Sequence, residues 1–241
     1  MCPTPAELSS IGDMFTDGHD CVRKLFDVEG REANSLSEEF NDILRELESR
    51  IKIAGPTYPI EFGLGRESLF ALYSIIRKSK PLKVLETGVA NGSSTFVILK
   101  ALETNHKGTL SSIDVNSNVA NCLNDEDKHR WDFFLLEEAN RTCLERIMSV
   151  VGNIELFIHD SNHNYYWQMM EYELSYQLLD RNGLMFSDDV DHSYAFFDFV
   201  RRNDLSASII FDRSKFTGIA KERSGEVKSD DVDSQNHSSL E

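Results

Sequence analysis

The chain has few cysteines, no long apolar run and none of the segments that direct a protein across a membrane. Its cysteines are Cys2, Cys21, Cys122 and Cys143, and no two of them form a CxxC pair. That spacing argues against a zinc ribbon or a dithiol redox motif and favours reduced thiols. No apolar run approaches the roughly 18 residues of a membrane-spanning helix, and the N-terminus lacks the basic and apolar regions of a signal peptide. We therefore expect a cytoplasmic protein with no membrane partner.

Basic residues are also scarce, because 25 Lys and Arg face 41 Asp and Glu, which gives a formal net charge of −16. An acidic surface repels phosphate backbones and anionic lipid headgroups, so we expect no nucleic-acid partner. Part of the acidity lies in residues 223–241, which are polar and lack aromatic side chains. Such a segment cannot bury enough apolar surface to fold, so we predict a disordered acidic tail.

Residues 1–55 are predicted to form a helical region. Ser35 and Glu38 are spaced as a capping box, and apolar residues then follow at helical spacing. A Gly-Pro pair at residues 55–56 ends this helix. The apolar face fits core packing, a lid over a binding site or an oligomer contact, and the sequence leaves these three roles open.

Residues 56–222 alternate between helix and strand, as expected of a parallel sheet covered by helices. We predict strands at 82–88, 108–115, 132–138, 154–160 and 183–189, and two more within 206–222 joined by a tight turn. We predict helices at 66–78, 93–102, 119–123, 141–150, 165–179 and 194–202. The expected fold is a Rossmann-like α/β three-layer sandwich. Its seven-stranded sheet is mostly parallel with a terminal antiparallel strand, and N-terminal helices are added to it.

A glycine-containing turn, Gly88 to Gly92, follows the first buried strand, which ends at Glu86. Ser93 then begins a helix. Glycines at the carboxyl edge of a sheet allow a ligand to approach the backbone closely. The run G-V-A-N-G-S lacks the second and third glycines of a G-x-G-x-x-G dinucleotide motif. This departure argues against a dinucleotide-binding oxidoreductase, although a turn without a ligand also fits the pattern.

Acidic residues end the next two strands. Asp114 ends the second strand, where a carboxylate can accept hydrogen bonds from both hydroxyls of a ribose. This position is common to nucleotide and S-adenosylmethionine sites, so it indicates an adenosine-containing ligand. The third strand ends at Leu136-Glu137-Glu138-Ala139, which also fits a solvated acidic loop.

A second polar cluster follows the fourth and fifth strands. Asp160 and His163 come after one strand, and Asp188 and Asp189 after the other. If these strands are neighbours, three carboxylates converge and raise one another's pKa values, a repulsion that a divalent cation would relieve. All-oxygen ligands suit Mg²⁺, with Mn²⁺ or Ca²⁺ as alternatives, whereas a helix cap with solvated neighbours needs no metal. His159 is expected to face the other side of its strand.

Over residues 60–220 the sequence resembles the class I S-adenosylmethionine-dependent methyltransferases. The turn after Glu86 resembles their motif I, with Ala90 at the middle glycine position. The D-x-x-H-x-Y stretch from Asp160 and the Asp-Asp pair of LLDRNGLMFSDD are similar to the metal-dependent small-molecule O-methyltransferases. Within that group the nearest resemblance is to the cephalosporin hydroxylase-like and macrolide-sugar O-methyltransferases. Asn162 departs from the pattern, since an Asp is common there.

The resemblance implies a role for each matching residue. Cofactor contacts are implied for Glu86, Gly88, Ala90, Asn91, Gly92, Ser93, Asp114, Glu138 and Asp160, with Glu138, or else Glu137, facing the adenine amino group. Metal ligation is implied for Asp160, Asp188 and Asp189, and the role of general base for His163. The implied reaction methylates a hydroxyl of a small acceptor, such as a sugar or natural-product scaffold, with S-adenosylmethionine and Mg²⁺ as cofactors. A metal-independent enzyme of the same fold is the alternative, and homo-oligomer formation stays open.

Overall fold

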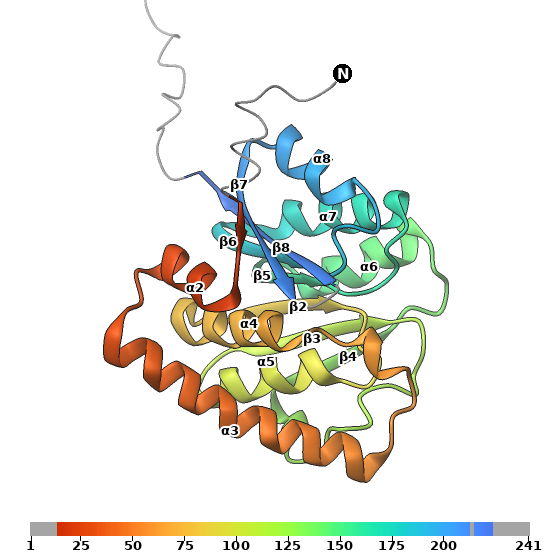
Figure 1. The fold of residues 1–241 in the computed structure, drawn as a ribbon. Coiled ribbons are helices and arrows are strands. Elements are labelled where there is room, and N and C mark those ends of the chain that lie inside the picture. Colours follow the sequence, from red (N-terminus) through yellow and green to blue (C-terminus); the bar gives the residue numbers. More distant parts are fainter. Residues whose placement is uncertain (1–13, 213–214, 224–241) are drawn as a thin grey trace, which may run out of the picture.

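A central sheet organises the molecule (Figure 1). The computed structural model describes residues 14–212 and 215–223, and within them eight strands form one sheet in the order β1-β7-β8-β6-β5-β2-β3-β4. The strands are β1 (Phe15–Thr16), β2 (Lys83–Thr87), β3 (Thr109–Asp114), β4 (Trp131–Leu135), β5 (Ile154–His159), β6 (Leu179–Ser187), β7 (Leu205–Asp212) and β8 (Lys215–Glu222). Neighbours run parallel except β8, which is antiparallel to both β6 and β7.

The predicted Rossmann-like fold is confirmed, with one strand more than expected. The additional strand β1 is two residues long and pairs in parallel with Ile209 and Ile210 of β7. It comes from the segment that the sequence predicted to be helical. The strand predicted at 183–189 begins earlier, because β6 starts at Leu179, and its pairing with β5 is irregular between Ile154 and Leu156.

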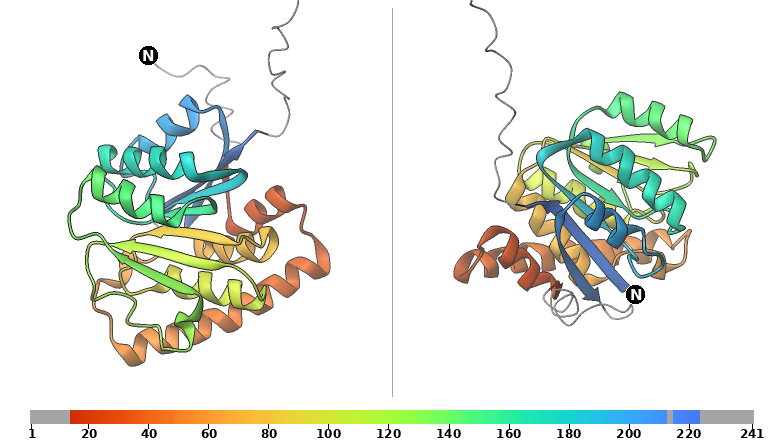
Figure 2. Two further views of the ribbon diagram at one scale, coloured as in Figure 1. Left: turned by 180° about the vertical axis from the view of Figure 1, so that it is seen from behind. Right: turned by 90° about the horizontal axis from the view of Figure 1, so that it is seen from above.

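Helices cover both faces of the sheet, as Figures 1 and 2 show. Alternate residues along β2 and β5 enter different cores, because successive side chains of a strand point to opposite faces. Val84 and Ile158 pack with helices α4 (Arg66–Ser79) and α5 (Ser93–Thr104), whereas Leu85 and Phe157 face the other layer. That layer consists of α6 (Arg141–Val151), α7 (Tyr165–Leu178) and α8 (Ala195–Arg202). The central strands are therefore apolar on both faces.

The N-terminal helices α2 (Gly18–Phe26) and α3 (Gly30–Ala54) lie outside the α4/α5 layer (Figure 1). Helix α3 packs its apolar face, including Phe40 and Leu44, against α4 and α5. It ends before Gly55 as predicted, but it begins at Gly30. The predicted capping box is therefore wrong, because Ser35 lies inside the helix and its hydroxyl donates to Glu39 instead.

The helix predicted at 119–123 is also wrong, because these residues form a loop that precedes a short 3-10 helix, η2 (Asp127–Arg130). Ala120 has a φ of 57°, a left-handed conformation that interrupts a right-handed helix. Its backbone N–H donates to the carbonyl of Ala90 at 2.9 Å, which fixes this loop against the glycine turn. This tertiary contact overrides the helix propensity of residues 119–123.

The parallel strands all end at one edge of the sheet, so the loops after β2, β3, β5 and β6 meet there. Because β8 runs the opposite way, its first residue, Lys215, lies at that same edge. In the described part of the chain no helix is both long and apolar enough to cross a membrane. Cys21, Cys122 and Cys143 are free thiols, whereas Cys2 and all but the first residue of the predicted tail lie outside the described residues.

Candidate functional site

A cavity of about 760 Å³ opens at the carboxyl edge of the parallel strands. It is bordered by the loops after β2, β3, β4, β5 and β6, by α7, and by the start of β8. Apolar walls with a few convergent polar groups are typical of a small-molecule site. The lining includes Tyr58, Phe62, Gly88, Val89, Ala90, Asp114, Leu136, Ala139, Asp160, His163, Trp167, Glu171, Asp189, His192 and Lys215.

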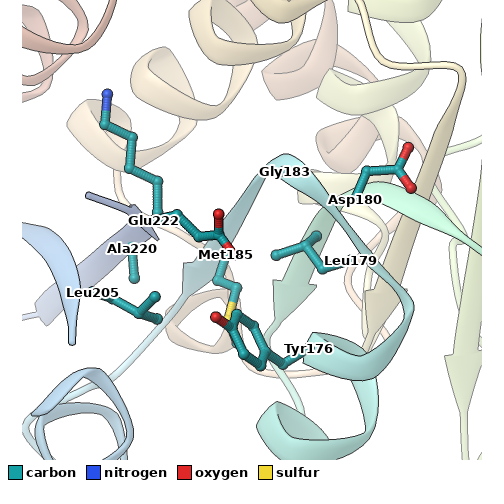
Figure 3. A pocket seen from close by; sticks show the side chains of 9 residues that line it. Tyr176, Leu179, Asp180, Gly183, Met185, Leu205, Ala220 and Glu222 are labelled. Atoms are coloured by element: carbon teal, nitrogen blue, oxygen red, sulfur yellow. The ribbon is translucent and has the colours of Figure 1, made fainter. Parts of the chain in front are cut away.

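A smaller cavity of about 120 Å³ lies near the first half of β6 (Figure 3). Tyr176, Leu179 and Met185 border it, together with residues from the beginning of β7 and the end of β8. None of the predicted site residues lines it. The larger cavity is therefore the candidate functional site.

The glycine turn forms one wall of the larger cavity. Gly88 has a φ of 85°, and a Cβ atom built on it would lie 1.9 Å from the carbonyl oxygen of Asp160. Glycine is required here because the loops after β2 and β5 touch each other through backbone atoms. Ala90 also lines the cavity, with a φ of 46°. The structure thus places two of the predicted cofactor residues, Gly88 and Ala90, in the wall.

Three further residues of the turn lie outside the cavity wall and hold the turn in place. Gly92 has a φ of 87° and precedes α5, and a Cβ atom there would lie 2.8 Å from Cα of Ala120. Ser93 is the first residue of that helix. The side chain of Asn91 accepts hydrogen bonds from the backbone N–H groups of Thr57 and Tyr58, both at 2.9 Å. Asn91 therefore fixes the segment that brings Tyr58 and Phe62 to the cavity.

Glu86 lies beneath the turn and is fully buried. Its carboxylate accepts hydrogen bonds from the hydroxyls of Ser94, Thr95 and Ser112 at 2.6 to 2.8 Å. Burial raises the pKa of Glu86 to about 7, although the three hydroxyls oppose this shift. This arrangement corrects the predicted direct cofactor contact, because Glu86 joins β2, β3 and α5 behind the wall.

Asp114 lies in the wall at the end of β3, as predicted. Its carboxylate accepts from the backbone N–H groups of Val89 at 2.8 Å and Asn116 at 2.9 Å. Each carboxylate oxygen has two lone pairs, so both can still accept from a ribose hydroxyl. These two bonds fix the carboxylate at the cavity edge before any ligand binds.

Leu136 and Ala139 form an apolar wall next to Asp114. Glu138 is exposed, and its carboxylate accepts from the side-chain amide of Asn140 at 3.0 Å. Glu137 is exposed as well. The structure therefore brings Leu136 and Ala139 to the cavity, whereas neither Glu137 nor Glu138 lines it.

The predicted carboxylates do converge at the opposite end of the cavity. Asp160 and Asp189 line it, and Asp188 is buried behind them. The ammonium nitrogen of Lys215 lies 3.0 Å from Oδ2 of Asp188 and 3.4 Å from Oδ2 of Asp189. The hydroxyl of Thr217 donates to Oδ1 of Asp188 at 3.2 Å. An amine of this chain thus neutralises the cluster.

These residues do not fit a divalent cation. Among residues 14–212 and 215–223 no group of three or more His, Cys, Asp or Glu side chains is arranged to hold a metal ion. Mg²⁺ needs oxygens at about 2.0–2.1 Å, whereas both oxygens of Asp188 already have donors and an ammonium lies between Asp188 and Asp189. Where the sequence predicted metal ligation by Asp160, Asp188 and Asp189, the structure thus shows contacts of Lys215 with Asp188 and Asp189.

The charges of the cluster shift one another's pKa values. Burial and the charge of Asp188 raise the pKa of Asp160 well above its ordinary range, and Lys215 opposes this shift. Burial and the charge of Asp189 raise the pKa of Asp188 in the same way. Burial alone would lower the pKa of Lys215, but Asp188 and Asp189 outweigh it, so the pKa is raised. The lysine therefore stays protonated beside the carboxylates.

His163 lies in the same wall, with Nε2 3.5 Å from Oδ2 of Asp189. Burial and the neighbouring His159 lower the pKa of His163 to about 4, although Asp189 opposes this shift. The imidazole is therefore neutral at neutral pH and has a free lone pair. Its buried Nδ1 has no hydrogen-bond partner among the described residues. The proton-acceptor role of His163 stays a prediction, and it would fall to Nε2, because Nδ1 is buried.

Sequence reasoning missed the group behind His163. His159 is buried and does not itself line the cavity, but its Nδ1 lies 2.6 Å from Oε2 of Glu171, which does. The ring centroids of His159 and His163 are 5.5 Å apart, and those of His163 and His192 are 5.4 Å apart. Glu171 also accepts from Thr87 at 2.7 Å. A buried carboxylate thus anchors a row of three histidines.

Lys215 was missed for a topological reason. The sequence predicts two strands joined by a tight turn at the C-terminal end, with Lys215 in that turn. Because an antiparallel strand begins at the edge where its parallel neighbours end, its first residue had to be considered for the site. The positions of Tyr58 and Phe62 had no comparable pattern, since they depend on the side-chain contacts of Asn91.

Residues 85–190 match the family model of a methyltransferase domain. The fold is also that of class I S-adenosylmethionine-dependent methyltransferases of known structure. A Podospora anserina methyltransferase solved with S-adenosylhomocysteine is 13% identical, with a TM-score of 0.54 over 93% of this chain and 99% of that one. No protein of curated function matches the sequence.

Two O-methyltransferases have the same fold. One from Bacillus cereus, in complex with S-adenosylhomocysteine, is 10% identical, with a TM-score of 0.54 over 85% of this chain and 96% of that one. The other is TomG from Streptomyces achromogenes, involved in tomaymycin synthesis and solved with S-adenosylmethionine. It is 14% identical, with a TM-score of 0.52 over 81% of this chain and 92% of that one. At these identities the likeness concerns the fold.

Proposed function

We propose that this methyltransferase domain binds S-adenosylmethionine and transfers its methyl group to a hydroxyl of a small molecule. The observation that carries the proposal is the division of one cavity into two chemically different ends. Asp114 with the wall of Leu136 and Ala139 suits an adenosine, and His163 at the other end suits an acceptor that must lose a proton. O-methyltransferases of the same fold support the choice of oxygen as the acceptor atom.

The cofactor would lie along the carboxyl edge of β2 and β3. Asp114 would accept hydrogen bonds from the ribose hydroxyls, while Leu136 and Ala139 would cover the adenine. The turn at Gly88 and Ala90 leaves backbone free of bulky side chains for the methionine part. Asn91, Gly92 and Ser93 would act by holding this turn, and Asp160 would border the reacting end.

Proton removal is the chemistry that the protein itself must supply. S-adenosylmethionine brings a methyl group on a positively charged sulfur, and S-adenosylhomocysteine leaves as the acceptor oxygen forms its bond to that methyl group. His163 accepts the hydroxyl proton on Nε2, the ring nitrogen that is not buried, and then releases it to water. Holding the acceptor in line with the methyl group would supply much of the rate gain, since alignment replaces a chance encounter.

Two features of the proposal concern cofactors other than S-adenosylmethionine. The sequence predicts Mg²⁺ or another divalent cation, but the ammonium of Lys215 between Asp188 and Asp189 supports the metal-independent alternative. The dinucleotide alternative has less support, because residues 85–190 match a methyltransferase domain and the turn lacks two of the three motif glycines.

The size of the cavity supports a small-molecule acceptor. Its volume of about 760 Å³ would have to hold both the cofactor and the acceptor. Tyr58 and Phe62 line the cavity, and their rings would contact an apolar part of the acceptor. A hydroxylated sugar or natural-product scaffold fits this description. Homo-oligomer formation through the N-terminal helices stays a prediction, which sedimentation analysis of the purified chain would test.

Methyl transfer can be measured before the acceptor has been identified. The purified protein is incubated with S-adenosylmethionine carrying a tritiated methyl group and with panels of hydroxylated sugars, phenols and polyketides. We expect label transfer to at least one hydroxylated compound, in the presence and absence of a chelator. Transfer only to amines or thiols would contradict the choice of oxygen, and transfer that stops with the chelator would contradict the metal-independent form.

A further inference from the structure

The carboxylate cluster has a resident cation in the side chain of Lys215. Asp188 is fully buried and Asp189 is nearly so, with 8% of its surface exposed. Among the described residues, Lys215 is the only lysine or arginine whose side-chain nitrogen lies within 4.0 Å of a carboxylate oxygen of Asp188 or Asp189. Buried carboxylates are costly unless a positive charge and hydrogen bonds compensate them. The lysine supplies both.

We propose that Lys215 takes the place of the divalent cation in this site, so that its ammonium group neutralises the carboxylates and contacts the acceptor oxygen without a metal. This proposal rests on the function proposed above in one respect, namely that the oxygen belongs to a methyl acceptor. The occupation of the cluster by an amine, and the resulting lack of a cation site, depend on the structure alone.

The fold fixes the position of Lys215 through the ends of β7 and β8. The last residue of β7, Asp212, accepts from the backbone N–H groups of Glu67 and Ser68 at the start of α4, at 2.5 and 3.4 Å. The hydroxyl groups of Ser68 and Thr217 lie 2.8 Å apart. These contacts hold the end of β7 and the start of β8 against α4. The position of Lys215 beside the carboxylates is therefore fixed by the packing of these three elements.

The hydrogen bonds of the ammonium group leave one donor for a ligand. A lysine ammonium has three N–H donors and no acceptor. Two of them are directed at Asp188 and Asp189, and the described residues provide no further acceptor for the third. Since Lys215 lines the cavity next to Asp160 and His163, the third donor can reach a ligand oxygen there. A positive donor at this point would favour the deprotonated acceptor, as a metal ion does.

Binding of Mn²⁺ tests the proposal independently of any acceptor. Wild-type protein and the variant Lys215→Ala are titrated with Mn²⁺, and the free ion is followed by electron paramagnetic resonance. We expect no binding of Mn²⁺ by the wild type at submillimolar concentrations. The variant should bind about one ion per chain, because removal of the amine leaves carboxylate oxygens with room for a cation. Lys221→Ala, which removes a lysine from the same strand, is the matched control and should behave as the wild type.

The wild-type titration decides the question even if Lys215→Ala does not fold. Binding of one Mn²⁺ per wild-type chain, lost on substitution of Asp188 by Asn, would overturn the proposal. A folded Lys215→Ala variant that ignores Mn²⁺ would also contradict it. These outcomes do not involve S-adenosylmethionine, so a failure of the proposed methyl transfer would be recognised separately.

A kinetic arm tests the contact with the acceptor oxygen. With a compound methylated in the panel assay, Lys215→Ala should lower kcat at least tenfold and leave the affinity for S-adenosylmethionine unchanged. Lys215→Arg retains the charge and should restore part of the lost rate. An unchanged kcat in Lys215→Ala would limit the lysine to a structural role and refute the proposed contact.

Discussion

At the scale of single residues, the site depends on side chains whose ionisation is set by their neighbours. His163 is kept neutral by burial and by His159, while Lys215 is kept charged by Asp188 and Asp189. A neutral imidazole and a charged ammonium group thus lie in the same wall of the cavity. Pairs of groups with opposite protonation states are typical of sites that move a proton.

Substitution of His163 tests its role as proton acceptor. We expect His163→Ala to lower kcat by about 10²–10⁴-fold, the usual contribution of a general base, without weakening the binding of S-adenosylmethionine. The exposed His129, changed to Ala, is the control. Both quantities are measured with an acceptor from the tritium assay and by calorimetric titration. Wild-type kcat in His163→Ala would remove the histidine from the mechanism.

Glu86 gives a prediction about stability and pH. Its pKa is raised from the ordinary 4.5 to about 7, so folding favours the protonated form. The stabilisation is complete below pH 4.5 and is lost as the pH rises through 7, with a magnitude on the order of 3 kcal/mol. In Glu86→Gln, which stays neutral, the free energy of unfolding should lack this decrease. Urea unfolding at both ends of the range measures it, with exposed Glu137→Gln as the control. An identical pH dependence in wild type and Glu86→Gln would contradict the assignment.

At the scale of elements, the loops after β2 and β5 form one unit. They touch at Gly88 and Asp160, and the loop after β3 joins them through the bond from Val89 to Asp114. A displacement of one loop therefore displaces the walls at both ends of the cavity.

Alanine substitutions at two glycines separate backbone strain from this contact. Gly88 and Gly30 both have positive φ, but only at Gly88 does an added Cβ atom meet another atom within 4 Å. We expect Gly30→Ala to cost about 1–2 kcal/mol of unfolding free energy from strain alone. Gly88→Ala should cost about 3 kcal/mol or more and abolish cofactor binding. Equal losses, measured by urea unfolding, would show that the contact with Asp160 is unimportant.

Elements with strong local patterns were predictable from the sequence, and elements set by distant contacts were not. The central strands were recognised because burial on both faces makes them continuously apolar, as at Val84 and Leu85. The start of α3 was misplaced, since Glu29 caps it without a side-chain hydrogen bond. The loop at Ala120 was predicted as a helix, because its left-handed backbone depends on the bond to Ala90.

The same distinction applies to the candidate site. Asp114, Asp160, His163 and the Asp188-Asp189 pair follow apolar strands, so their convergence was predictable from the rule that parallel strands end at one edge. The partner of the carboxylates was not, because Lys215 is 27 residues from Asp188 along the chain and reaches it through an antiparallel strand. Predicting a metal followed from counting carboxylates without this amine.

At the scale of the whole molecule, the arrangement of the sheet gathers the site at one edge while both faces are buried. The parallel strands supply the acidic side chains, and the antiparallel β8 supplies the counter-charge. The central claim is that this edge binds S-adenosylmethionine.

Calorimetric titration of the chelator-treated protein tests that claim most directly. We predict that S-adenosylmethionine binds at one site per chain, that NAD⁺ does not bind, and that Asp114→Ala weakens S-adenosylmethionine at least tenfold, a loss of about 1.4 kcal/mol or more. Asp125→Ala, which removes an exposed carboxylate from the next loop, should bind as the wild type does. The claim would be contradicted by a folded wild-type protein that binds neither S-adenosylmethionine nor S-adenosylhomocysteine at about 1 mM. Such a concentration detects binding free energies of about −4 kcal/mol.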